Sequence, residues 1–227
     1  MPDALKDASS ALVYANDFNG SATPIVNTVG IPAITLNSDN ATGIVGSVAT
    51  QPWANMSGIN TSFTISMDLV SFTGNNWADV VSIHATSNMS IEQNDSGDMY
   101  LYVGDNFAGS TVSNGFVCLG SVDSLIGKSL TVVMDAVNKE VVAYVDNNQV
   151  GIVTLPYEAE AQVGAVDGLQ FGSGWGGGHG ANEVVIDNLY IWNKALTANE
   201  VASIPEPATA TLSLLALAGL AARRRRH

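Results

Sequence analysis

Arginine is missing from nearly the whole of this 227-residue chain, because its only four arginines stand together at positions 223–226. The part of the chain before Pro205 contains four lysines and 20 of the 21 acidic residues, so its net charge is −16. So acidic a surface repels the phosphates of nucleic acids, and it favours solubility outside the cell and weak binding of cations. We therefore expect no nucleic-acid partner.

Cysteine is almost absent too. Cys118 is the only one, which excludes an intrachain disulfide and a cysteine-based metal site. Because it lies in the apolar run 116–119, we expect a buried and inert thiol. The chain also lacks an HExxH motif, a P-loop and a dinucleotide-binding fingerprint, and no nucleophile is paired with a base around its three histidines. These absences argue against several common enzyme classes.

The last 23 residues have an unusual order. Pro205-Glu206-Pro207 is followed by fifteen mostly apolar residues, 208–222, and then by Arg223, Arg224, Arg225 and Arg226. As a helix of about 1.5 Å per residue, the apolar run would reach roughly 22 Å, short of the ~30 Å hydrocarbon core unless flanking residues and snorkelling arginines extend it. A short apolar helix with a terminal basic cluster predicts a membrane stop whose arginines stay in the cytoplasm. The alternative, a helix packed back on the domain, gives four consecutive arginines no role.

This tail resembles a PEP-CTERM sorting signal, the bacterial C-terminal tag read by transpeptidase-like membrane enzymes of the exosortase class. The resemblance implies an exported protein, held in the membrane by the tail helix before processing and then placed at the cell surface or in the extracellular matrix. Export also needs an N-terminal signal, yet residues 1–7 (MPDALKD) contain neither a basic n-region nor an apolar h-region. A misplaced start, a leader missing from this sequence and a chain that is not exported in this form all stay open.

The body shows short alternating runs separated by clusters of Gly, Asn, Asp and Ser, which predicts an antiparallel β-sandwich. One face of the run 61–69 carries Phe63, Ile65, Met67 and Leu69, and Trp192 is expected in the core. The predicted strands are residues 11–18, 61–69, 78–85, 98–103, 115–119, 129–135, 140–145, 150–155, 168–171 and 184–192. One short helix is expected after them, because Thr197 and Glu200 form a capping box.

Three segments of the body resemble the concanavalin A-like, LamG-type jelly roll. They are YANDFNG at 14–20, LTVVMD with VVAYVDNN at 130–135 and 141–148, and IDNLYIWNKALTANEV at 186–201. Asn147 stands where the family's hairpin has glycine, and asparagine tolerates a left-handed turn. The resemblance implies an all-β sandwich of two antiparallel sheets over residues 11–204, followed by the sorting signal at 205–227.

Laminarinase-type glucanases share this fold and use a glutamate, an aspartate two residues later and a second glutamate on one strand. No glutamate in this chain has aspartate at that spacing, and Glu158 and Glu160 lie in a predicted loop. The resemblance therefore implies a protein that is not an enzyme, with a degenerate glycosidase as the weakest alternative.

Two kinds of site remain as hypotheses. Many jelly rolls of this kind hold a structural Ca²⁺ near the first and last strands, and the matching residues here are Asp17, Asn19 and Asp187. The alternative is that Asp17 and Asn19 cap a turn and that Asp187 accepts backbone amides at a bulge. Sugars are bound in this fold by exposed aromatic residues and loop amides. The candidates are Trp53, Trp77, Trp175 and His179, each of which is also explained as a packing or loop residue.

We therefore expect a lectin-like surface protein that binds extracellular polysaccharide. A structural or adhesive envelope protein without a sugar site is the alternative. Exposed, coplanar tryptophans favour the first function, and buried tryptophans with a flat polar sheet favour the second. A close carboxylate pair in a cleft favours the glycosidase.

Overall fold

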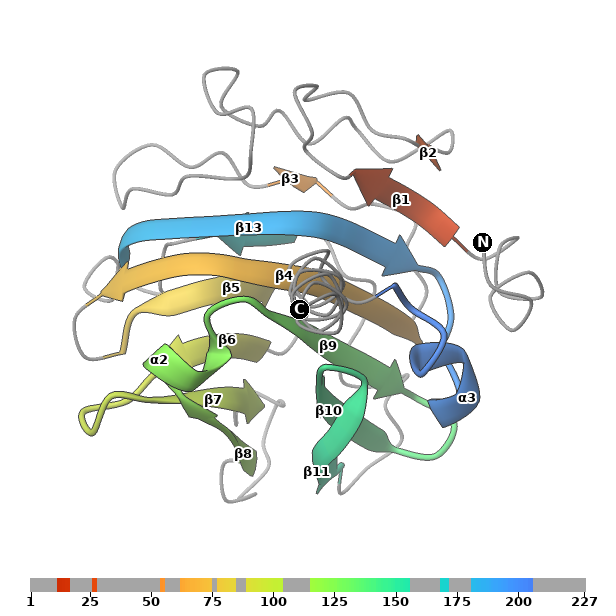
Figure 1. Cartoon of the computed structure of the whole chain (residues 1–227). Helices are drawn as coiled ribbons and strands as arrows, with labels where there is room; N and C mark the ends of the chain where they lie inside the picture. Colours follow the sequence, from red (N-terminus) through yellow and green to blue (C-terminus); the bar gives the residue numbers. More distant parts are fainter. Residues whose placement is uncertain are drawn as a thin grey trace, which may run out of the picture.

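The computed structural model describes residues 12–16, 26–27, 54–55, 62–74, 77–84, 89–103, 115–155, 168–171 and 181–205. Within these ranges the chain forms two antiparallel sheets that stack as a jelly-roll sandwich, as expected (Figure 1). The boundary placed at residue 204 stays a prediction, and the tail helix lies outside the described residues.

The first sheet has seven strands in the order β11-β10-β9-β4-β13-β1-β2. Their bounds are β1 Leu12–Asn16, β2 Val26–Asn27, β4 Phe63–Gly74, β9 Lys128–Asp135, β10 Glu140–Val145, β11 Asn148–Thr154 and β13 Ala181–Trp192. The second sheet has six strands in the order β3-β12-β5-β6-β7-β8. Their bounds are β3 Ala54–Asn55, β5 Asp79–His84, β6 Met89–Gln93, β7 Asp98–Val103, β8 Gly115–Ser121 and β12 Gly168–Phe171. Two short helices, α2 Val122–Leu125 and α3 Ala198–Val201, complete the described part of the chain.

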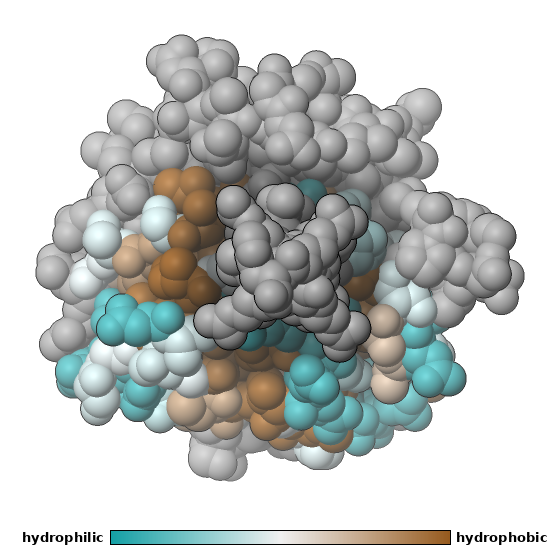
Figure 2. All heavy atoms as spheres, in the orientation of Figure 1, coloured by the Kyte–Doolittle hydropathy of each residue, from teal (hydrophilic) through white to brown (hydrophobic). Residues whose placement is uncertain are grey.

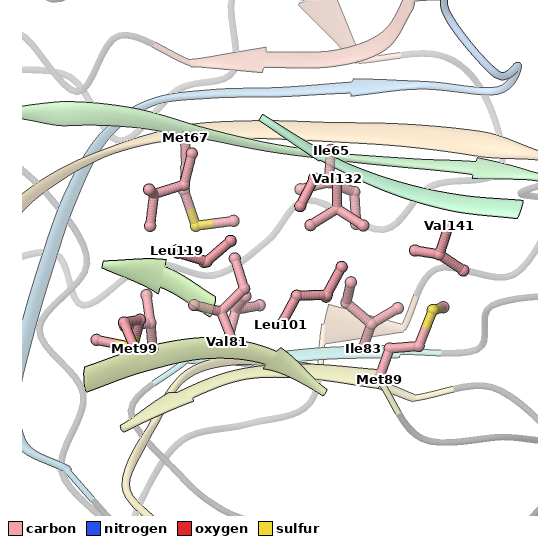
Figure 3. Close-up of a cluster of buried hydrophobic side chains, with 14 of the residues drawn as sticks. Ile65, Met67, Val81, Ile83, Met89, Met99, Leu101, Leu119, Val132 and Val141 are labelled. Atoms are coloured by element: carbon pink, nitrogen blue, oxygen red, sulfur yellow. The ribbon is translucent and has the colours of Figure 1, made fainter. Parts of the chain in front are cut away.

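The main hydrophobic core lies between the two sheets. The predicted apolar face of β4 is fully buried, since Phe63, Ile65, Met67 and Leu69 are all 0% exposed. Side chains of the seven-stranded sheet, such as Met67, point toward side chains of the six-stranded sheet, such as Leu101 (Figure 3). The two-residue period of each strand thus selects which face enters the core.

A second hydrophobic cluster covers part of the outer face of the seven-stranded sheet. Helix α3 and the residues around it bring Leu196, Val201 and Ile204 against Trp192 of β13 and against β9 and β10. Trp192 is buried as expected, but in this second cluster rather than between the sheets. The face seen in Figure 1 otherwise mixes hydrophobic and hydrophilic residues over its described part (Figure 2).

The predicted capping box fixes the start of α3. The Thr197 amide donates to Glu200 Oε2 at 2.8 Å, and the Glu200 amide donates to Thr197 Oγ1 at 3.4 Å. Lys194 adds an ion pair to Glu200 at 2.6 Å. Burial alone would raise the pKa of Glu200, but these hydrogen bonds from Lys194 and Thr197 lower it. These interactions therefore stabilise the N-terminal end of α3.

The two sheets approach each other where the edge strands β8 and β11 meet. A Cβ added to Gly151 would lie 2.5 Å from Val117 Cγ1, and one added to Gly115 would strike Val153. Each valine thus occupies the space that a side chain opposite it would need. Two glycines, one on each strand, permit this close approach.

The hairpin between β10 and β11 turns at Asp146 and Asn147, whose φ angles are 46° and 62°. Asn147 therefore adopts a left-handed backbone conformation, as predicted. The Asn147 side chain also donates to the carbonyl of Ile204 at 3.0 Å, which joins this turn to the segment that follows α3.

The structure differs from the sequence-based expectations in five places. Strand β6 was not expected, nor were the two-residue strands β2 and β3, nor helix α2. The expectation of a buried thiol was wrong, because Cys118 is exposed. Residues 116–119 alternate across the sheet, so Val117 and Leu119 face the core while Phe116 and Cys118 face outward.

Candidate functional site

The outer face of the six-stranded sheet carries a group of aromatic side chains. In β7 the buried residues Met99, Leu101 and Val103 alternate with the partly exposed Tyr100 and Tyr102. The antiparallel register places Tyr102 opposite Phe116 of β8, and Tyr100 opposite Cys118. Cross-strand neighbours of one register face the same side, so these side chains gather on a single surface.

The aromatic rings are in contact with one another. The ring centres of Tyr102 and Phe116 are 5.0 Å apart, and those of Tyr100 and Phe116 are 6.2 Å apart with nearly perpendicular planes. Phe116 nevertheless leaves 47% of its surface exposed. Contiguous exposed apolar patches on protein surfaces often mark interaction sites.

Trp77 joins this group from the turn before β5. Its φ angle of 65° is unusual for a bulky residue, and its amide donates to the carbonyl of Gln93 in β6 at 2.7 Å. The side chain remains 38% exposed. Together with Tyr100, Phe116, Glu92 and Asn94 it lines a pocket of about 80 Å³. Backbone strain of this kind is concentrated at functional sites, and here it orients an exposed indole.

Carboxyl groups lie beside the aromatic residues. Asp79 of β5 and Glu92 of β6 are direct register partners, and their carboxyl groups hydrogen-bond to each other. The Ser82 hydroxyl donates to Asp79, and the Ser90 hydroxyl donates to Glu92 Oε2 at 3.0 Å. Asp79 is only 3% exposed, whereas Glu92 is partly exposed and lines the pocket.

This environment keeps a proton on the pair. Burial is the largest effect and, with the neighbouring Glu92, it raises the pKa of Asp79 from 3.8 to about 8, although the hydrogen bond from Ser82 opposes the change. Two carboxylates in contact cannot both be ionised at low energy. At neutral pH Asp79 is therefore protonated.

The carboxyl pair does not have the geometry of a glycosidase. Retaining enzymes hold their two carboxyl groups about 5–5.5 Å apart and inverting enzymes hold them farther apart, so that a sugar or a water molecule fits between them. Asp79 and Glu92 are in hydrogen-bond contact, and Asp79 is buried. Two carboxyl groups in contact leave no space between them for that reaction.

Of the sequence-predicted sugar-binding residues, the structure brings Trp77 into this site. Trp53, Trp175 and His179 lie outside the described residues. Sequence reasoning missed Tyr100, Tyr102, Phe116, Glu92 and Asp79. The signal was present for the tyrosines, because the alternation in DMYLYV points them away from the core.

The predicted calcium ligands are described only in part. Asp17 and Asn19 lie outside the described residues, but Asn16, which precedes them, pairs with Leu189 in β13. Asp187 pairs with Asp68 of β4, and Asn188 donates to Asp68 Oδ2 at 2.7 Å. Within the described ranges, no three histidine, cysteine or acidic residues gather as a metal-binding group. Calcium binding stays a prediction.

Comparison with known families identifies the end of the chain. Residues 203–226 match the PEP-CTERM protein-sorting motif. Pro205 is the one residue of the predicted signal that the structure describes, and it is exposed. Within the described part of the chain, neither short helix is long and apolar enough to cross a membrane. The motif defines an exported protein that an exosortase-type system sorts to the cell surface.

Solved structures show the same fold at low sequence identity. The binding domain of Paraclostridial Mosquitocidal Protein 1 matches with a TM-score of 0.56 and 16% identity over 86% of this chain and 52% of that chain. The NanB sialidase from Streptococcus pneumoniae matches with a TM-score of 0.51 and 20% identity over 65% of this chain and 24% of that chain. No curated protein matches the sequence. The chain thus joins a jelly-roll fold to a C-terminal PEP-CTERM sorting motif, and the LamG-type label stays a resemblance.

Proposed function

We propose that this protein is a non-catalytic, lectin-like surface protein that binds extracellular polysaccharide on the outer face of the six-stranded sheet. The observation that supports this most is a group of aromatic side chains on one face beside the carboxyl group of Glu92: Trp77 and Phe116 are exposed, and Tyr100 and Tyr102 are partly exposed. Aromatic faces stack on the C–H faces of sugar rings, and carboxylate and amide groups bond the hydroxyls.

The sorting motif agrees with such a role, because it directs the protein to the place where extracellular polysaccharide is found. We propose further that an exosortase-type enzyme processes the chain near Pro205-Glu206-Pro207, and that the apolar tail holds it in the membrane until then. Mass spectrometry of the mature protein from its native host tests this step. Recovery of the intact tail, including Arg223 to Arg226, would contradict it.

A structural or adhesive envelope protein without a sugar site is the second candidate. The exposure of the candidate tryptophans helps to distinguish the two functions. Trp77 is 38% exposed, which favours the sugar-binding function. The experiment that separates them is a glycan array probed with the folded protein, with and without calcium. Binding to one polysaccharide class supports the lectin-like function. Absence of binding both with and without calcium favours the structural alternative.

The same array tests calcium. Binding that requires calcium would support a site at Asp17, Asn19 and Asp187, and would make Asp187→Asn the next variant to measure. Binding that is indifferent to calcium would leave the sugar site intact and count against a functional role for the ion.

A further inference from the structure

The first residues of the sorting motif belong to the folded domain. Ile204 is 3% exposed and packs in the second hydrophobic cluster with Trp192 and Val201. Its amide donates to the carbonyl of Val201 at 3.0 Å, and its carbonyl accepts a hydrogen bond from the Asn147 side chain at 3.0 Å. The next residue, Pro205, is exposed. The chain therefore enters the Pro-Glu-Pro segment from the outer face of the seven-stranded sheet, which this cluster covers.

The connection from this point to the apolar tail is short. Only three residues, 205–207, separate Ile204 from the apolar run 208–222. Even when fully extended, the chain from residue 204 to residue 208 spans at most about 14 Å. The two sheets of a sandwich lie about 10 Å apart, and the side chains on both outer faces add to its thickness. A connection of this length cannot pass around the sandwich to its other face. While the tail is held in a membrane, the face that carries α3 is therefore the one beside it.

The same face keeps two apolar side chains exposed at its edge. Val150 and Ile152 of β11 are 41% and 45% exposed, respectively. Ile152 is the direct register partner of Val142, which belongs to the second hydrophobic cluster, so both side chains lie on the outer face. Val150 and Ile152 thus continue the apolar surface that Ile204 and its neighbours bury. Exposed apolar surface of this kind marks sites that contact proteins or membranes.

The seven-stranded side also holds every lysine that the structure describes. Lys128 lies in β9, Lys139 in the turn between β9 and β10, and Lys194 between β13 and α3. Lys128 pairs with Asp146 and Lys194 pairs with Glu200, which neutralises those two carboxylates. The described strands of the six-stranded sheet contain acidic residues but no lysine or arginine. Anionic lipid headgroups therefore repel the seven-stranded side less than they repel the opposite face.

We propose that, before processing, the face that carries α3, Val150 and Ile152 docks on the lipid headgroups of the membrane. The inference rests on the proposed anchoring by the tail and adds the orientation of the domain. The two sheets lie back to back, so the aromatic face of the six-stranded sheet then points away from the membrane (Figure 1). The proposed polysaccharide site is thus open to the extracellular side while the chain is still anchored.

The single cysteine provides a reporter for the far face, because Cys118 is exposed on the outer side of the six-stranded sheet. Full-length protein is reconstituted in vesicles of phosphatidylcholine and phosphatidylglycerol and carries a fluorophore at Cys118. Two further proteins carry Cys118→Ser and the same fluorophore at Asn199→Cys on α3 or at Ile152→Cys on β11, both exposed positions. Lipids with a nitroxide on the headgroup quench fluorophores near the membrane surface. We expect quenching at positions 199 and 152 to be several-fold stronger than at Cys118.

Strong quenching at Cys118 would overturn the inference without any substitution in the protein. Weak quenching at all three positions of vesicle-bound protein would overturn it too, because the domain would then stand off the membrane. A label at position 152 that is shielded from iodide in the water but not quenched by the headgroups would assign the patch to the tail or to a second copy of the chain, against the inference. Flotation of the vesicles tests the anchoring separately. Protein that does not float with them would contradict the proposed membrane anchoring itself.

Discussion

Asp79 and Glu92 face each other across β5 and β6, and their carboxyl groups share a hydrogen bond. A bulge between Asp79 and Val81 brings the two into register, and it leaves both Val80 and Val81 buried. The Ser82 and Ser90 hydroxyls supply one further hydrogen bond to each carboxyl group. The arrangement keeps a proton inside the protein beside the aromatic pocket, and this has a measurable consequence for stability.

The stability of the protein should fall as pH rises toward 8. The folded state holds the Asp79 proton up to about pH 8, whereas the unfolded chain releases it near 3.8, so the folded state binds more protons between these values. Stability is then lost as pH rises, with a slope of up to about 1.4 kcal/mol per pH unit from this residue. Urea unfolding of the wild type and of Asp79→Asn between pH 5 and pH 9 measures it. The variant should lose less stability and be the more stable protein at pH 9, and parallel curves would contradict the shared proton.

Removal of the helix cap should destabilise the end of the domain. Thr197→Ala deletes the side chain that accepts the Glu200 amide, and such a change typically lowers the free energy of unfolding by about 1 kcal/mol. Asn199→Ala is the matched control, because Asn199 is exposed in the same helix. Chemical denaturation of both variants measures their free energies of unfolding, and Thr197→Ala should be the less stable. Equal stability of the two would show that the capping box has no energetic weight.

The glycine at the meeting of β8 and β11 should not tolerate a side chain. Gly151→Ala places a methyl group 2.5 Å from the Val117 side chain, and overpacking of this kind costs about 1–3 kcal/mol. The double variant Gly151→Ala/Val117→Ala removes the clash, so it should lose less stability than the two single changes added together. If the stability losses of the two single variants simply add in the double variant, then the added methyl group does not clash with Val117, and the prediction is wrong.

Much of the fold could be predicted because the strands are amphipathic. From Phe63 to Leu69 apolar and polar residues alternate strictly, although both faces of this stretch are buried, and the capping box at Thr197 is a local signal. Asn147 could be assigned to a turn because its neighbours are turn formers as well. Such features depend on a few adjacent residues, so they are visible in the sequence.

The site was harder to predict because it depends on register between distant strands. The residues around Asp79 do not indicate that it lies opposite Glu92, because a bulge in β5 sets that pairing. The exposure of Trp77 follows from a left-handed backbone that tryptophan rarely adopts. The prediction that Cys118 is buried was wrong for a related reason. All four residues at 116–119 are apolar, but successive residues of a strand point to opposite faces of the sheet, so only two of the four enter the core.

The central claim is that the aromatic face of the six-stranded sheet binds polysaccharide, and Phe116 tests it most directly. Binding isotherms of wild type, Phe116→Ala and the control Ile152→Ala would be measured on the polysaccharide that the glycan array selects. Ile152 is an equally exposed apolar residue of the other sheet, at 45% against 47%. We predict an affinity loss of about tenfold or more for Phe116→Ala, equivalent to about 1.4 kcal/mol, and none for Ile152→Ala. Unchanged affinity in a folded Phe116→Ala protein would contradict the account.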